Sequence, residues 1–86
     1  MPRLSAFYGI VIYLYVRDHG PPHLHAIHGE DQASVDIATG DLVAGTLRPR
    51  QYRLVRSWVE LHRAELLTAW ELASAGEPPG TIDSLP

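Results

Sequence analysis

The chain has 86 residues, which is enough for one domain with a modest hydrophobic core and leaves no room for a second core. Hydrophobic residues make up 45% of the sequence and charged residues 20%, so the composition is that of a folded globular protein and excludes a disordered chain. The formal charge of −3 argues against general adhesion to nucleic acid, and the absence of cysteine excludes disulfides, thiolate catalysis and thiolate metal sites.

The sequence contains no segment typical of a membrane or secreted protein. The longest apolar run, residues 8–16, falls well short of the roughly 20 residues that span a bilayer. The first nine residues contain one arginine and no long apolar stretch, unlike a secretory signal peptide. We therefore expect a cytoplasmic protein without a membrane partner, and the lack of cysteine agrees with this expectation.

Residues 8–17 are rich in β-branched and aromatic side chains and predict the first strand. Because successive side chains of a strand point to opposite faces, the aliphatic set that begins at Ile10 is expected to face the core. Tyr13, Tyr15 and Arg17 are then expected on the other face. The double proline that follows cannot lie inside a central strand, so the chain is expected to form a loop there.

Two turn signals, "GEDQ" and "TGD", divide the next segment into three further strands. The expected strands cover residues 23–28, 33–38 and 42–47, and Gly45 weakens the last of them. The strand region as a whole is predicted at about residues 8–47.

From Pro49 the hydrophobic residues recur at steps of three and four, the period of an amphipathic helix. Pro49 suits the first helical turn, and Gly76 followed by two prolines predicts an end near residue 75. An unbroken helix of this length, about 39 Å, is long for so small a domain. We therefore expect one bent helix or two consecutive helices, divided near residues 62–64, followed by an extended tail over residues 76–86.

Strands followed by a helical region are the signature of an α+β fold. We predict a single domain, residues 1–86, in which a three- or four-stranded antiparallel sheet packs on the helical region. Trp58 and Trp70 lie near the same helical face and are expected to anchor the core. His62 lies on the same face, so we expect it to be at least half buried and bonded to a sheet carbonyl or a nearby acid.

Four of the five histidines lie within residues 17–30. If residues 29–32 form a four-residue hairpin turn, His25 faces Asp36 across the two strands, and residues directly opposite share a sheet face. A register shifted by one residue would put the imidazoles in the core, which is unfavourable. The resulting patch on the face away from the core consists of Tyr13, Tyr15, Arg17, His23, His25, Ser34 and Asp36.

Three interpretations of this patch remain open. In a catalytic site, His23 and His25 would act as general acid and base, Asp36 would orient an imidazole, and Arg17 would stabilise charge in the transition state. In a metal site, Asp36 or His19 would join the two imidazoles, but the spacing fixes no third ligand. In a structural patch, the polar groups fix the hairpin and the face binds a partner protein. We favour the last interpretation and assign no metal and no cofactor.

Arginines gather around the expected start of the helix, where the helix dipole does not favour cations. Arg53 and Arg56 are neighbours on the helix surface, and Glu60 lies within reach of Arg56. The group is either a solvated face, or Arg50 and Arg53 contact phosphate or an acidic partner.

The residues also carry a family resemblance. The blocks "FYGI", "DHGPPHLHA", "DIATG" and "VRSWVELHRAELLTAW" resemble, in order and spacing, the bacterial family known as domain of unknown function 4160, over roughly residues 4–80. The resemblance implies a short cytosolic bacterial protein whose gene often lies beside one for domain of unknown function 2442, a pairing suggested to be toxin–antitoxin-like. It makes His28 a poor candidate for a required ligand. The family pattern also marks a set of positions as important to the family. In this sequence they are Asp18, His19, Pro21, Pro22, His23, His25, Trp58, His62, Glu65, Leu66 and Trp70.

On this resemblance we expect one subunit of a two-gene module that acts by binding a small cognate protein from the adjacent gene. The expected binding residues are Tyr13, Tyr15, Asp18, His19, Arg50 and Arg53. The alternatives are a metal-independent, ribonuclease-like toxin that uses the histidine patch, and a histidine-based metal-binding domain, so enzymatic activity is left open. A homo-oligomer is compatible with the sequence, and the net charge does not indicate nucleic-acid binding.

Overall fold

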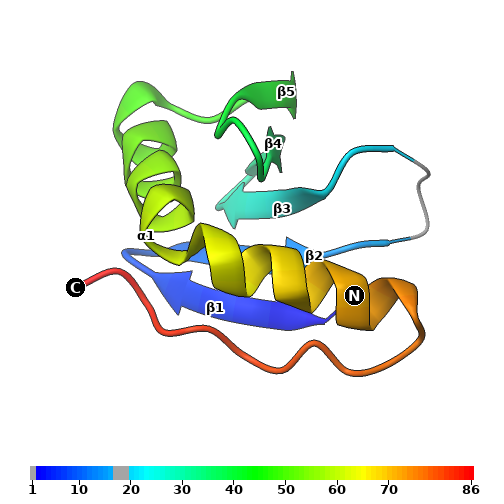
Figure 1. The fold of residues 1–86 in the computed structure, drawn as a ribbon. Helices are drawn as coiled ribbons and strands as arrows, with labels where there is room; N and C mark the ends of the chain where they lie inside the picture. Colours follow the sequence, from blue (N-terminus) through cyan, green and yellow to red (C-terminus); the bar gives the residue numbers. More distant parts are fainter. Residues whose placement is uncertain (1, 17–19) are drawn as a thin grey trace.

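The computed structural model describes residues 2–16 and 20–86. The elements are β1 (Arg3–Phe7), β2 (Ile10–Leu14), β3 (His23–His28), β4 (Asp31–Asp36), β5 (Leu42–Gly45) and α1 (Pro49–Ser74). The strands pair in the order β1-β2-β3-β4-β5, each antiparallel to the next, and α1 follows them (Figure 1). This arrangement confirms the predicted α+β fold class.

The hydrophobic core lies between one face of the sheet and α1. Alternate side chains of β2 and β3 are completely buried on that face, and Trp58 and Val59 of the helix are completely buried with them. The Phe7 ring packs on the Trp58 ring with centroids 5.4 Å apart. The fully buried strand residues of this core are Leu4, Ile10, Ile12, Leu14, Leu24, Ala26 and Val35. Each large aliphatic side chain among them contributes about 1.5–3 kcal/mol.

The predicted number of three or four strands is wrong, because the sheet has a fifth strand, β1, that the sequence did not reveal. The strand predicted over residues 8–17 begins only at Ile10. Tyr8 and Gly9, with φ of 50° and 77°, form a tight turn between Phe7 and its partner Ile10. An irregularity in the pairing of β1 buries both Leu4 and Ser5, which removes the two-residue alternation that marks a strand.

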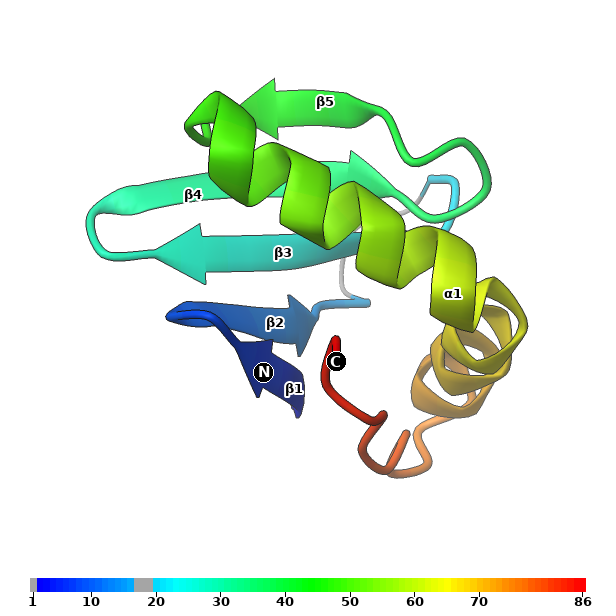
Figure 2. The same ribbon diagram turned by 90° about the vertical axis from the view of Figure 1, so that its left-hand side faces the viewer.

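Helix α1 is one helix with a kink at His62, whose φ of −117° and ψ of 21° are not helical. The kink confirms the bend predicted near residues 62–64. The first half of α1 lies across the sheet over β3 and β4, and the second half turns away past the ends of the strands (Figure 2). Among the described residues, no helical segment combines the length and hydrophobicity that a membrane crossing requires.

The tail after α1 is extended, as predicted, and it packs along β1. The Ile82 N–H donates to the Leu4 carbonyl at 2.8 Å, and the Ile82 side chain is buried. The indole Nε1–H of Trp58 donates to the Asp83 carbonyl, also at 2.8 Å. The tail therefore covers the β1 edge of the sheet and provides the acceptor for a donor on a completely buried side chain.

We expect Gly45→Ala to destabilise the fold strongly. A Cβ at Gly45, where φ is +75°, would overlap the Gln32 carbonyl oxygen and lie 2.9 Å from the Ala33 Cα, so backbone atoms would have to move. Gly76→Ala is the matched control, because Gly76 has φ of +82° with open space around its Cβ. The control is expected to lose only about 1–2 kcal/mol, the ordinary penalty of a left-handed residue. Urea unfolding of both variants measures the difference, and equal losses would contradict this explanation.

Candidate functional site

The phase of β3 places His23 and His25 on the face of the sheet away from α1. Leu24 and Ala26, which alternate with them, are completely buried on the core face. The imidazoles are half-buried, like Ser34 and Asp36 on the neighbouring strand. The predicted strand phase is therefore confirmed. We call this side of the sheet, away from α1, the open face.

The predicted hairpin register is wrong by two residues. His28 pairs directly with Asp31, so the turn between β3 and β4 contains two residues and not four. As a result His25 faces Ser34, and Asp36 faces His23. A shift of two residues keeps every side chain on its face, because the side-chain period of a strand is two. The patch survives, but its cross-strand pairs change.

Four rings form a chain of contacts at one end of the open face, which we call the ring cluster: Tyr15, His25, His23 and Trp70. The ring centroids of Tyr15 and His25 are 6.0 Å apart, those of His25 and His23 5.4 Å, and those of His23 and Trp70 5.2 Å. The first two contacts are edge-to-face, an arrangement that aromatic quadrupoles favour. Trp70 comes from the second half of α1, so the kink brings a helix residue to the start of β3.

Polar side chains of the open face form hydrogen bonds with nearby backbone groups and with one another. His23 Nδ1 lies 3.0 Å from the Pro21 carbonyl oxygen, and His25 Nδ1 lies 3.5 Å from Ser34 Oγ. Asp36 Oδ1 accepts the Thr39 N–H at 3.0 Å, which holds the turn after β4. Within residues 2–16 and 20–86, no hydrogen bond joins Asp36 to a histidine, so its expected orienting role remains a prediction.

Two hollows adjoin on the open face. One, of about 310 Å³, is lined in part by Pro21, His23, Asp36 and Val43, and the other, of about 170 Å³, is lined in part by His25. They share Ser34 and Ala44, so they form one depression over β3, β4 and β5. The surface of the larger hollow is mostly carbon. Val43, one of the lining residues, is 59% exposed.

The other predicted site residues fall into three groups. Arg50 and Arg53 are exposed on the first half of α1. Tyr13 pairs with His25 across β2 and β3, and it is half-buried on the open face. Arg17, Asp18 and His19 lie outside the described residues. In the part of the chain that the structure describes, no group of three or more His, Asp or Glu side chains is close enough to hold a metal ion.

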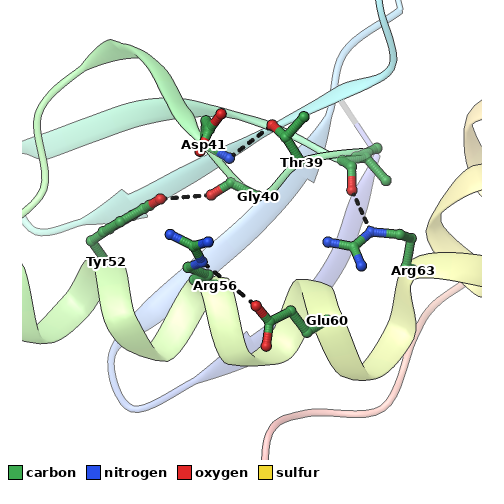
Figure 3. A network of polar contacts seen from close by, with 8 residues as sticks. Thr39, Gly40, Asp41, Tyr52, Arg56, Glu60 and Arg63 are labelled. Atoms are coloured by element: carbon green, nitrogen blue, oxygen red, sulfur yellow. Dashed lines mark hydrogen bonds and ion pairs between the residues drawn. The ribbon is translucent and has the colours of Figure 1, made fainter.

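Helix α1 is fixed to the turn after β4 by Tyr52 and Arg63, which were not predicted as site residues, and it carries the expected Arg56–Glu60 pair beside them (Figure 3). The Tyr52 hydroxyl donates to the Gly40 carbonyl at 2.7 Å, and Arg63 Nε donates to the Ile37 carbonyl at 2.9 Å. Arg56 Nε lies 3.5 Å from Glu60 Oε1. The pKa of Arg56 is raised above its ordinary value, first by Tyr52 and then by Glu60. The four-residue spacing of Arg56 and Glu60 predicted their pairing, whereas no local signal indicates the contacts of Tyr52 and Arg63 with the turn.

His62 belongs to a different group of contacts. Its Nδ1 lies 2.7 Å from Glu65 Oε1, its ring centroid is 5.5 Å from that of Trp58, and its side chain is only 11% exposed. This confirms a largely buried histidine bonded to a nearby acid. No ring contact in the described part of the chain joins His62 to the ring cluster. The two groups of histidines are therefore separate.

The fold and the site define a small two-layer α+β domain whose sheet has one helix-covered face and one open face. The chain belongs to the family described as Domain of unknown function (DUF4160), whose model matches residues 9–71. Comparison with curated proteins and with solved structures gave no match. The matched segment contains β2 to β5 and most of α1, and with them the ring cluster and both hollows.

The contact between His23 and Pro21 predicts a tautomer. A carbonyl oxygen can only accept, so neutral His23 must carry its proton on Nδ1, which leaves Nε2 as an acceptor. A long-range ¹H–¹⁵N spectrum above the titration range should show a protonated Nδ1 and an unprotonated Nε2 for His23. The same spectrum should assign Nδ1–H to His62, which faces a carboxylate oxygen. A proton on Nε2 of neutral His23 would contradict the observed contact.

Proposed function

We propose that the chain is the binding subunit of a two-component, toxin–antitoxin-like module and that it holds a small cognate protein on its open face. The observation that carries this proposal is the depression over β3 to β5, which adjoins the ring cluster and lies on the face of the sheet opposite the buried core. The family resemblance supports the two-component part of the proposal, because genes of similar proteins often lie in pairs.

The composition of the depression supports a protein ligand. Of the described residues that line it, Asp36 is the one with a formal charge, taking histidine as neutral. The centres of protein interfaces are depleted in charged residues and enriched in aromatic ones. Tyr13, Tyr15 and the two imidazoles offer large, half-buried surfaces whose polar atoms can still form hydrogen bonds. The open face therefore has the chemistry of the centre of an interface.

The size of the face is sufficient for a stable complex. A standard interface buries about 800 Å² on each partner, which is roughly one sixth of the 5037 Å² that this chain exposes. One face of a two-layer domain provides an area of that order. A chain this short also has a small core, so a bound partner adds stability by mass action.

We expect Val43→Glu to abolish the complex with the cognate protein without unfolding the chain. Val43 lines the larger hollow and is 59% exposed, so a carboxylate is tolerated in the free protein but would be desolvated in the complex. Leu61→Glu is the matched control, because Leu61 is an equally apolar residue, 58% exposed, on α1. Co-purification with the product of the adjacent gene measures the effect. Loss of the complex in both variants, or in neither, would count against binding at the open face.

A second candidate function, a metal-independent ribonuclease-like toxin, is favoured by one specific observation. His23 and His25 lie side by side with ring centroids 5.4 Å apart, and the Pro21 contact leaves Nε2 of His23 able to accept a proton. In this proposal the two imidazoles act as acid and base, and Asp36 and Arg17 keep the roles expected of them from the sequence.

The catalytic proposal makes its own prediction. Expression of the chain should arrest growth, and His23→Ala or His25→Ala should relieve the arrest while thermal unfolding stays close to that of the parent. His28→Ala is the matched control, since His28 is on the same strand but lines neither hollow of the open face. RNA cleavage by the purified chain in excess chelator provides the direct assay. Arrest that persists in both patch variants would exclude the catalytic role.

A further inference from the structure

The extended tail after α1 lies in a trough between two elements of the fold. A hollow of about 320 Å³ lies between the tail and the second half of α1, and another of about 410 Å³ lies between the tail and β1. Thr81 and Ile82 line both hollows, so the tail runs between them along β1 (Figure 1). The trough is therefore wider than the segment that occupies it.

The backbone of the tail makes little use of the edge of β1. Within residues 2–16 and 20–86, a single backbone hydrogen bond joins the tail to the five residues of β1, from the Ile82 N–H to the Leu4 carbonyl. A paired strand of that length would form several. Ile82 also has the one buried side chain of residues 77–86, with 7% of its surface exposed. The tail is therefore held on β1 mainly at one residue.

The other polar contacts of the tail use its backbone carbonyls. The Asp83 carbonyl accepts from the indole Nε1–H of Trp58, and the Pro86 carbonyl accepts from the Tyr8 hydroxyl, each at 2.8 Å. The Trp58 side chain is completely buried, so its donor requires an acceptor in the trough. Any extended segment that follows the same path can provide a carbonyl there. These contacts therefore select an extended backbone and not a particular sequence.

The two hollows differ in charge and polarity. In the hollow beside β1, Arg3 is the charged residue of the strand and Asp83 is the charged residue of the tail. Opposite charges favour a segment with a carboxylate at the position of Asp83. The hollow beside α1 is lined mainly by apolar side chains such as Leu72, with Glu65 as its charged residue. It has room for an apolar side chain larger than that of Thr81.

We propose that the trough is a docking site for an extended segment of a separate partner protein and that the tail is its exchangeable occupant. The segment places an aliphatic side chain where Ile82 lies, a carboxylate beside Arg3 and a larger apolar side chain in the hollow beside α1. The tail of a second copy would make only the contacts already present, and the intramolecular tail has an effective concentration of about millimolar. A segment that fills the hollows gains contacts that the tail lacks. The proposal does not depend on the function proposed for the open face.

The probes are two synthetic peptides, one with the sequence of residues 77–86, "EPPGTIDSLP", and one that also carries Thr81→Tyr. Each is titrated into the full chain. The indole N–H resonance of Trp58 reports binding in the trough, because this group bonds to a carbonyl of the occupant. The peptide with Thr81→Tyr should bind about tenfold more tightly than the unchanged peptide, since its ring fills the hollow beside α1.

The decisive substitution is Ile82→Ser, because it should have opposite effects in the chain and in the peptide. In the chain it loosens the tail, so the unchanged peptide should bind about tenfold more tightly than it binds the parent. In the peptide it removes the aliphatic side chain, so binding to the trough should be lost. A tail with a structural role alone predicts neither effect.

Tyr8→Phe loosens the tail without changing a buried side chain. Tyr8 is 53% exposed, and the variant loses the hydrogen bond to the Pro86 carbonyl. Affinity for the peptide should rise about two- to fivefold. Tyr52→Phe is the matched control, because it also loses one hydrogen bond from a hydroxyl to a carbonyl, that of Gly40, outside the trough. The control should bind the peptide as the parent does.

Arg3→Ala and Arg50→Ala form a second matched pair with the same change in net charge. The first variant should weaken binding of the peptide, which keeps its carboxylate at residue 83. The second should not, because Arg50 lines neither hollow of the trough.

The proposal fails if neither peptide binds the Ile82→Ser or Tyr8→Phe chain saturably, or if Tyr8→Phe and Tyr52→Phe bind the peptide equally. It also fails if binding leaves the Trp58 indole resonance unchanged. A parent chain that forms dimers by exchanging tails, and thereby excludes the peptide, would overturn the assignment of the trough to a separate partner.

Discussion

The burial of Leu24 and Ala26 against α1 is the constraint from which the candidate site follows. Both side chains are completely buried, and their neighbours in the strand must point to the opposite face. A slip of one residue would place His23 and His25 in the core and two aliphatic side chains in water. Imidazoles buried without partners would destabilise such an arrangement. The core therefore selects the strand phase, and the strand phase creates the open face.

The kink at His62 allows α1 to contribute a residue to the candidate site. A straight helix of this length would be about 39 Å long, longer than the 33 Å that is the largest extent of the molecule. The kink lets the second half stay packed on the protein, and it brings Trp70 to His23. Arg63 follows the kink directly and donates to the Ile37 carbonyl, which ties the turning point to the end of β4. The ring cluster thus depends on a local break that the buried His62 occupies.

The features that could be predicted from the sequence are those that depend on periodicity. The alternation in β2 and β3 predicted which of their side chains are buried, and the three- and four-residue steps predicted the buried face of α1 with Val55, Trp58 and Leu66, although Leu61 of the same pattern is exposed. The length of the helical region predicted its bend. The hairpin register could not be obtained in this way, because two-residue and four-residue turns leave every side chain on the same face. The strand β1 was missed for a related reason, since successive buried residues at Leu4 and Ser5 hide its period. The contacts of the tail join Trp58 to Asp83, and no local signal in the sequence indicates such a pairing.

The two ends of the β3–β4 hairpin differ in their chemistry. The end at His23 and Asp36 lies on the open face, where aromatic surface predominates and formal charge is scarce. The end at His28 and Asp31 adjoins the helix start, where guanidinium groups and backbone donors gather. The ends of β3 are about 17 Å apart at about 3.3 Å per residue, so the two regions are separate parts of the surface. Screening in physiological salt acts over about 8 Å, which leaves little direct electrostatic coupling across that distance. Any coupling between the two regions would have to pass through the packed hairpin and α1, the same contacts that fix the strand phase.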